Sequence, residues 1–343
     1  MQLTTDQRMH WMDILRGFAM ILVLAWHAPA IPALLGAELP DWLLAANDAL
    51  LPYRMPTLMF VSGLLLPAAL RKPTGRYYWG KLQLVVWPYL VWSALHILQS
   101  DSGEPFFHWR SWIATGYLWF IFFIACYYLV APLLARLPPW IVPAAALAAA
   151  LVLPDGLAVR MTYFAFFFFA GAAVSRSPRL LGLIGSTWWV ALPAGVVAVG
   201  FGVVSAFERH QFEAWTAPFS LCGIVAAIYC ARRIEHRRWT RPLRFVGRNS
   251  LVFYVAHFPI VLGAWLLVRG ALSDSIAVAS VLLFVIAIAA CSALAVVQRY
   301  RPVIWLFRAP DVPAMLRRIP PRRTSAAPAR PAPERVPEGD LLP

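Results

Sequence analysis

The sequence predicts an all-α integral membrane protein with about ten transmembrane helices and both termini in the cytoplasm. Three observations support this prediction: 61% of the 343 residues are apolar, only 13% are charged, and the mean hydropathy is +0.65. Soluble domains contain about 25% charged residues, so this chain has too few of them to cover a water-exposed surface. The composition therefore excludes an ordinary cytosolic enzyme and a disordered scaffold.

Ten apolar segments come close to the length that a membrane helix needs, which is about 20 residues. The fifth and sixth are short, and the run Phe164–Phe169 dominates the sixth. No repeat of the kind that builds solenoids is visible. The expected helices cover residues 11–28, 55–70, 82–98, 115–135, 140–153, 159–174, 187–206, 216–231, 247–268 and 276–297.

The distribution of cations gives the orientation of these helices. If the amino terminus is cytoplasmic and ten helices alternate, 25 of the 30 Lys and Arg residues fall in inner segments. This bias is the positive-inside rule, and it places both termini in the cytoplasm. The net charge of +14 is then explained by topology and by anionic membrane lipids, and no nucleic-acid partner is expected. The five outer cations are Arg54, Arg110, Arg160, Arg209 and Arg269.

The character of the chain changes after about residue 308. Residues 1–307 form the expected transmembrane domain, whereas Pro, Ala and Arg dominate residues 308–343 without any hydrophobic periodicity. Such a composition buries little apolar surface. We therefore expect a disordered cytoplasmic tail that lies on the anionic inner leaflet.

Titratable side chains are costly inside a bilayer, so each one is a candidate functional residue. Away from the helix ends, the ten expected helices contain His27, His96 and His257, whereas Asp13 and Arg16 lie at the cytoplasmic mouth of the first helix. His96 is near the outer end of its helix, where an interfacial histidine with satisfied hydrogen bonds is the favoured interpretation. The four cysteines also lie in apolar segments, but they lack C-x-x-C spacing, and no metal site is predicted.

Arg16 and His27 are eleven residues apart, close to three helical turns, so their side chains share one face of the first helix. Arg16 is at the cytoplasmic end, and His27 is about 16 Å deeper in the membrane. A long anionic ligand from the cytoplasm could place its phosphates at Arg16 and its far end at His27. The alternative is an arginine that extends to the headgroups and a histidine that only packs.

Four motifs, in order along residues 8 to about 300, resemble those of the acyltransferase-3 family of bacterial membrane proteins. The first has the family's Arg, ten intervening residues and a His. The overall pattern is most similar to the fucose 4-O-acetylase-like branch. The motifs are Asp13-Ile-Leu-Arg-Gly-Phe-Ala19 with His27, Met55-Pro-Thr-Leu-Met-Phe-Val-Ser-Gly63, Leu118-Trp-Phe120, and Gly247-Arg-Asn-Ser-Leu251 with Tyr254 and His257-Phe-Pro259.

The resemblance implies transfer of an acyl group, usually acetyl from acetyl-CoA, to a hydroxyl of a glycan or another cell-envelope acceptor. It also implies a multi-pass protein of the bacterial plasma (inner) membrane. His27 would perform the catalysis and Arg16 would support the CoA end. An alcohol needs a base to attack a thioester, and neutral imidazole is well suited near pH 7. His27 acts either as this base or as a carrier of the acyl group.

The first inner loop departs from the family pattern. Relatives often have an Arg-x-x-Arg pair before a proline, whereas only Lys81 remains here before Pro88. Arg71, Lys72 or Arg76 could replace the missing cation. We therefore expect Lys81 and Arg76, together with Arg16, to bind the CoA donor.

Further candidates concern the acceptor. Many relatives have a histidine where this chain has Arg54, at the outer end of the expected second helix, so Arg54 faces the acceptor or forms a local ion pair. Trp119 stacks on a sugar or belongs to the aromatic belt at the interface. Tyr254 and His257 share a helix face and form a second polar station near the site, or a hydrogen-bonded pair that locks two helices.

Two other classes of protein compete with the acyltransferase. A transporter or flippase of a glycan or lipid-linked acceptor would usually show broken helices at matching positions of internal repeats, and this symmetry is not visible. A structural subunit would explain the apolar composition but not the spacing of Arg16 and His27. Ser62-Gly63 is interpreted as a point of close helix packing rather than as a nucleophile.

Overall fold

The computed structural model describes residues 9–99, 106–272 and 275–310, and these form helices without any strand, so the all-α prediction is confirmed. The chain divides into two units, residues 1–309 and 310–343. Most of the expected disordered tail, residues 311–343, lies outside the described residues. The principal helices are α1 His10–Leu34, α2 Asp41–Leu64, α3 Leu66–Leu70, α4 Thr74–Lys81, a π-helix at Leu82–Val86, α5 Trp87–Gln99, α6 Trp119–Leu134, α7 Ile141–Val152, α8 Leu157–Ser175, α9 Pro178–Ser186, α10 Trp188–Phe207, α11 Ala217–Ile234, α12 Arg241–Arg248, α13 Ser250–Leu272 and α14 Ile276–Val297.

Nine helical segments of the described chain are long and apolar enough to cross a membrane. Each corresponds to one of the expected helices, but the second begins much earlier than predicted, at Asp41 instead of residue 55. Pro52 and Pro56 lie inside α2, because membrane helices tolerate proline when neighbouring groups satisfy the freed backbone atoms. Arg54 is therefore inside a helix rather than at its outer end.

The helix expected at 140–153 is the exception, since α7 has only 12 residues and is about 18 Å long. Its neighbours α6 and α8 nevertheless run parallel. Trp119 packs against Phe164 at 4.9 Å between ring centroids, and Tyr127 packs against Phe168 at 5.3 Å. The chain must return between the end of α6 and the start of α8, and α7 makes this return. A tenth crossing, by α7, stays a prediction, because nine helices of the described residues reach membrane length.

Contacts between distant segments bring the basic ends of the helices together. The backbone N–H of Trp11 donates to Oε2 of Glu235 at 3.1 Å, and the Arg232 guanidinium lies 5.2 Å from the Trp11 ring centroid. The start of α1 and the end of α11 thus lie at the same end of the bundle. Arg16, Arg232 and Arg233 lie near this end, and the positive-inside rule predicts that it is the cytoplasmic one.

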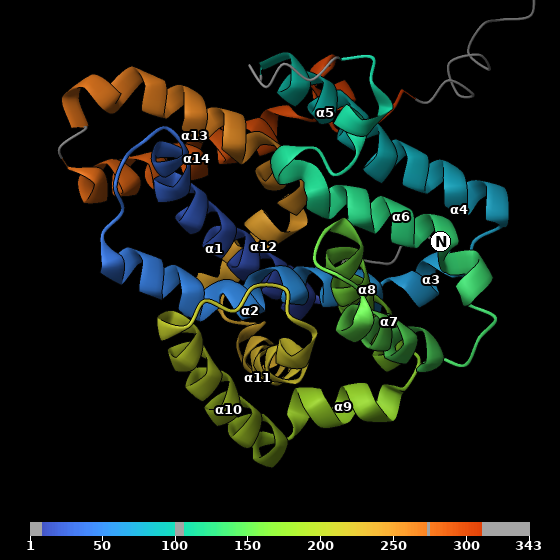
Figure 1. Cartoon of the computed structure of the whole chain (residues 1–343). Helices are drawn as coiled ribbons and strands as arrows, with labels where there is room; N and C mark the ends of the chain where they lie inside the picture. Colours follow the sequence, from blue (N-terminus) through green and yellow to red (C-terminus); the bar gives the residue numbers. More distant parts are fainter. Residues whose placement is uncertain (1–8, 100–105, 273–274, 311–343) are drawn as a thin grey trace, which may run out of the picture. The chain divides into compact units, whose positions relative to one another are not determined.

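Helix α1 lies inside the bundle and contacts α2, α11, α12, α13 and α14 (Figure 1). Its contact with α12 is made backbone to backbone. A Cβ atom on Gly17 would lie 2.0 Å from the carbonyl oxygen of Leu243, and one on Gly247 would lie 1.8 Å from that of Asp13. Only glycine permits this approach, which places Arg16 beside the start of α13.

A second glycine pair joins α2 to α8. A Cβ atom on Gly63 would lie 1.8 Å from the carbonyl oxygen of Phe168, and Gly171 approaches α2 in the same way. The neighbouring Ser62 hydroxyl donates to the Leu58 carbonyl of its own helix at 2.7 Å. The interpretation as a packing point is confirmed for Gly63, whereas Ser62 lines a cavity on the other side of the helix contact. The core beside it contains the aromatic run of α8, in which Phe164, Phe167 and Phe168 are fully buried.

Candidate active site

Two of the predicted site histidines meet inside the bundle. Helices α1 and α13 run parallel, and the rings of His27 and His257 contact each other edge to face, with centroids 4.7 Å apart. His257 is completely buried. Phe258 also borders the pair, 6.5 Å from His27. The structure therefore brings together one histidine from the first motif and one from the last.

Each histidine is held by the backbone of its own helix. The Nδ1 atom of His27 donates to the Val23 carbonyl at 2.8 Å, and that of His257 donates to the Tyr254 carbonyl at 2.7 Å. A neutral imidazole that donates through Nδ1 carries its lone pair on Nε2. Among the described residues, Nε2 of His257 is buried without a hydrogen-bond partner. Both rings are thus fixed in the tautomer that leaves Nε2 able to accept a proton.

A cavity of about 290 Å³ lies between α1, α2, α6, α13 and the π-helix. Arg16 lines it at the cytoplasmic end, and Tyr254, one turn before His257, lines it further in. Arg16 also donates from Nη2 to the Val61 carbonyl at 3.4 Å. The cavity therefore extends from the predicted donor-binding cation to Tyr254, whose ring is 6.2 Å from that of His257, and neither His27 nor His257 lines it.

The π-helix shapes one wall of this cavity. It contributes Leu84 and Val85 to the lining, directly after Lys81. π-helical turns are rare and occur frequently at functional sites, because the wider turn displaces side chains from the α-helical register. The loop in which the sequence departs from the family pattern is thus also the loop with irregular helix geometry.

Lys81 lies at the same end of the cavity as Arg16. Its Nζ atom is 3.2 Å from the ring centroid of Tyr128, which lines the cavity, and its charge is close enough to that of Arg16 to interact with it. Arg76, the other predicted donor-binding residue, is exposed on α4 and does not line the cavity. Lys81 and Arg16 are therefore brought together, and Arg76 is not.

Tyr254 connects α13 to the start of α6. Its hydroxyl donates to the Tyr117 carbonyl and accepts a hydrogen bond from the Phe120 backbone N–H at 3.2 Å. Its ring is 6.2 Å from that of His257, and the two side chains share no hydrogen bond. Tyr254 thus locks two helices by itself while its ring faces the cavity.

Sequence analysis missed two neighbours of the histidine pair, Tyr117 and His96. The Tyr117 ring stacks on Phe258 at 4.6 Å and lies 5.6 Å from His257. His96, interpreted above as an interfacial residue, lies 5.4 Å from Tyr117 and 5.8 Å from Phe258. A third histidine therefore belongs to the surroundings of the site.

A proline provides the signal that could have indicated Tyr117. Pro259 lies inside α13 and has no N–H to donate to the Val255 carbonyl one turn earlier. In a membrane that carbonyl needs another donor. The Tyr117 hydroxyl supplies it at 2.7 Å, so a polar side chain from a neighbouring helix could be expected here.

The Arg54 side chain is buried, with 6% of its surface exposed, and its Cζ atom is 5.9 Å from the Trp26 ring centroid. Asp48, the nearest acidic residue on α2, pairs with Arg209 at 3.8 Å instead. The Arg54 charge is close enough to His27 to act on it electrostatically. The charge of Asp48 acts on Arg54 as well. Arg54 is thus close to both Asp48 and His27, and its role in acceptor binding stays a prediction.

Trp119 lies in a different aromatic cluster. The Arg160 guanidinium is 4.9 Å from its ring centroid, and Phe212 packs against it at 6.0 Å. The structure therefore separates Trp119 from the rings that surround His27, although both groups adjoin the start of α6.

Comparison with known proteins decides the family. A family model described as an acyltransferase domain, the one of the acyltransferase-3 family, matches residues 9–297. The chain belongs to this family. No curated protein and no solved structure matches the chain. The matched range of this membrane acyltransferase includes α1 to α14, and with them the cavity and the histidine pair. The resemblance is confirmed at the level of the family.

Proposed function

We propose that this acyltransferase transfers acetyl, or another short acyl group, from acyl-CoA in the cytoplasm to a hydroxyl of a glycan or another cell-envelope acceptor at the bacterial inner membrane. The observation that supports this proposal most is the cavity from Arg16 to Tyr254, which leads from the cationic inner end toward His27 and His257. A donor with anionic and reactive ends fits this polarity.

The donor would lie with its phosphates at Arg16 and Lys81 and with its thioester toward the histidines. A cavity of about 290 Å³ is at the lower limit of sites that enclose a small ligand. It therefore suits the narrow arm of CoA, while the nucleotide stays at the basic inner face, where Arg76 is accessible. Charge-assisted hydrogen bonds to phosphate would supply much of the affinity.

His27 would handle the proton of the reaction. In direct transfer, Nε2 removes the proton from the acceptor hydroxyl while its oxygen attacks the thioester carbonyl. A C–O bond forms, the C–S bond breaks, and the proton passes from the imidazolium to the departing thiolate. In the acyl-carrier route, Nε2 itself attacks the thioester carbonyl, an N–C bond forms, the C–S bond breaks and the CoA thiolate leaves. The acceptor oxygen then attacks the acyl group, the N–C bond breaks, and the hydroxyl proton passes by way of the freed Nε2 to the thiolate. Both routes need the tautomer that the Val23 carbonyl selects.

The acceptor would approach His27 from the outer half of the membrane. His257 borders His27 there, and the Arg54 charge acts on it. We therefore assign acceptor binding or positioning to His257, Tyr254 and Arg54. The more distant cluster of Trp119 would contact only an extended acceptor.

The proposal can be tested with a strain that lacks the gene. Envelope glycans and lipids are compared by mass spectrometry after complementation with the wild type, with His27→Ala, or with His108→Ala as a matched control in an exposed outer loop. We expect acyl groups to return with the wild type and the control only. Restoration by His27→Ala would contradict the proposal, as would acceptor transport by the purified protein without release of CoA.

A further inference from the structure

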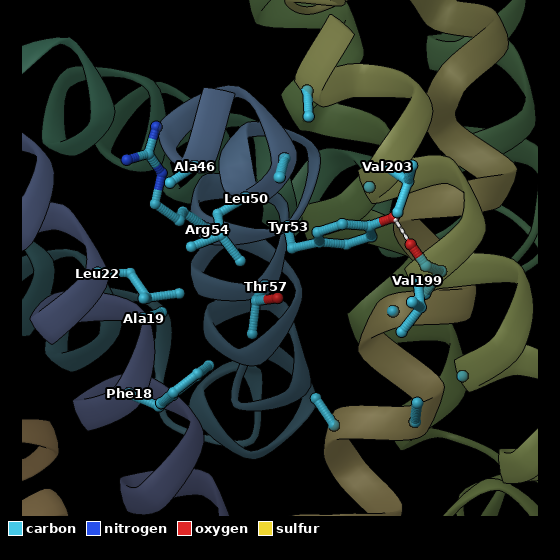
Figure 2. A pocket seen from close by; sticks show the side chains of 18 of the residues that line it. Phe18, Ala19, Leu22, Ala46, Leu50, Tyr53, Arg54, Thr57, Val199 and Val203 are labelled. Atoms are coloured by element: carbon cyan, nitrogen blue, oxygen red, sulfur yellow. Dashed lines mark hydrogen bonds between the residues drawn. The ribbon is translucent and has the colours of Figure 1, made fainter. Parts of the chain in front are cut away.

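The acyltransferase has a second large hollow, which we call the lateral groove. It lies between α1, α2, α10 and α11 and has a volume of about 590 Å³ (Figure 2). Its lining extends along α2 from Ala45 to Thr57, a distance of about 18 Å. Eleven of the 20 lining residues are Ala or Gly, so four helices meet here without enough side-chain volume to fill the space between them.

The groove lies within the span of the membrane. All its lining residues belong to membrane-crossing helices, and wall residues such as Val199, which is 70% exposed, are uncovered by the rest of the protein. At this depth an open side faces hydrocarbon rather than water. The ligand that fits an apolar hollow of this shape and position is a hydrocarbon chain that enters sideways from the bilayer.

One charged side chain lines this apolar groove. Figure 2 shows Tyr53 and Arg54 leaving α2 on opposite sides, Tyr53 toward α10 and Arg54 toward α1. The Tyr53 hydroxyl is satisfied by the Ala198 carbonyl. Arg54, by contrast, is 6% exposed and is in direct ion-pair contact with no carboxylate of the described residues. Asp48 is close enough for its charge to act on Arg54, but its direct partner is Arg209. A buried cation without a direct ion pair is costly in a membrane, so an anionic ligand would relieve this cost.

We infer that the lateral groove holds the hydrocarbon chain of a membrane-anchored acceptor, and that Arg54 binds a phosphate at the head of this lipid. The hydroxyl to be acylated then lies beyond the phosphate, toward His27, since the Arg54 guanidinium is 5.9 Å from the ring of Trp26, the residue that precedes His27. The inference rests on the proposed function and specifies its acceptor as a lipid-linked phosphate rather than a free sugar.

The inference is tested by equilibrium binding to the full-length protein in phosphatidylcholine nanodiscs. The probes are hexadecyl phosphate and hexadecanol, which share the chain and differ in the charge. Val199→Trp fills the groove, and Val197→Trp is the matched control, since Val197 is on the same helix and 42% exposed but does not line the groove. Ala46→Phe is a second groove-filling variant in case Val199→Trp does not fold.

We expect the wild type to bind hexadecyl phosphate at least about tenfold more tightly than hexadecanol. A charge-assisted hydrogen bond between Arg54 and the phosphate provides this difference in affinity. Filling the groove should weaken binding of both probes by about tenfold or more, and Val197→Trp should not. Arg54→Gln should remove the preference for the phosphate and keep the binding of hexadecanol. Equal affinity for the two probes, or unchanged binding in the groove-filling variants, would overturn the inference.

Two further measurements separate this inference from its alternatives. Phosphatidylglycerol added to the nanodiscs should compete poorly, and equal competition would show a site for ordinary membrane lipid and overturn the inference. Probe binding is measured without a donor, so it is independent of catalysis. Acetyl transfer to a soluble glycan with no binding of hexadecyl phosphate would uphold the proposed function and overturn the groove assignment. Probe binding without any release of CoA would contradict the proposed function alone.

Discussion

The rings of His27 and His257 are in edge-to-face contact, with centroids 4.7 Å apart, although the two residues come from the first and the penultimate membrane helices. Each ring is held through Nδ1 by a carbonyl of its own helix. The pair therefore presents two Nε2 atoms with available lone pairs in one small volume. A substitution at either residue changes the surroundings of the other. The two roles are therefore assigned by comparing variants of both residues.

His27→Ala is expected to lower turnover by about 10²–10⁴-fold, which is the usual contribution of a general base. Acetyl-CoA binding should be retained, because the cationic end of the cavity is about three helical turns away. The measurement is release of CoA at saturating donor, together with the donor Kd. The matched control is His108→Ala, which should leave both values unchanged. A folded His27→Ala protein with near-normal transfer would refute the mechanism.

His257→Phe keeps an aromatic ring next to His27 but removes Nε2, which is buried without a partner among the described residues. We expect kcat to fall, by less than in His27→Ala, with little change in the donor KM. Thermal unfolding in detergent should show that the variant is folded. If kcat stayed at the wild-type value, His257 would have a packing role only.

Arg16→Ala should show the opposite pattern from His27→Ala. Loss of a charge-assisted contact with phosphate weakens donor binding by about 1.5–3 kcal/mol, which corresponds to about 10- to 150-fold in Kd. Turnover at saturating acetyl-CoA should fall less. Arg136→Ala removes an exposed cation of another inner segment and serves as the control. An unchanged donor Kd in Arg16→Ala would argue that this arginine only supports helix packing.

Gly17→Ala and Gly247→Ala should both destabilise the protein. A Cβ atom at either position would overlap a backbone carbonyl at about 2 Å, and overpacking of this kind costs about 1–3 kcal/mol. Gly200→Ala is the control, because a Cβ atom at this helical position meets nothing within 4 Å. The free energy of unfolding can be compared in one detergent. Equal stability of all three variants would show that the helices separate easily at this contact.

Cysteine labelling in a background without native cysteines tests the path of α7. If the short helix crosses, a cysteine at residue 136 reacts only from the cytoplasm and one at residue 155 only from outside. The reference positions are 76 and 237, expected inside, and 210, expected outside. Residues 104 and 315, which the charge pattern places outside and inside, lie outside the described residues. Labelling of residue 155 from the cytoplasm would show that α7 does not cross the membrane. The number of passes would then be odd, or two fewer than ten if a second helix also does not cross.

The all-α membrane fold could be predicted from composition and hydropathy, whereas the orientation that the cations indicate stays a prediction, because the structure contains no membrane. The shortness of α7 was predicted as well, and it is confirmed. Pro138 and Pro139 precede it, and Pro154 forces Leu153 out of the helical region, where its ψ is 143°. The positions of Arg16 and His27 on one continuous helix followed from their spacing alone.

The surroundings of the site could not be predicted in the same way. His96 and Tyr117 reach the histidine pair through contacts between helices that are distant in the sequence, and hydropathy contains no information about these contacts. The lateral groove has the same origin, since its alanines and glycines are spread over four helices and become a cavity only when those helices meet. Arg54 was expected at a helix end because the start of α2 was placed too late.

The central place of α1 has a consequence for biogenesis. Its partners include α12, α13 and α14, which leave the ribosome long after α1 does. At about 5–20 residues per second, on the order of ten to forty seconds pass between the synthesis of α1 and that of α13. Throughout this interval α1 lacks the neighbours that later surround His27. The newly made protein therefore exposes an incompletely packed first helix to membrane quality control, and it becomes competent for catalysis only when α13 has been inserted.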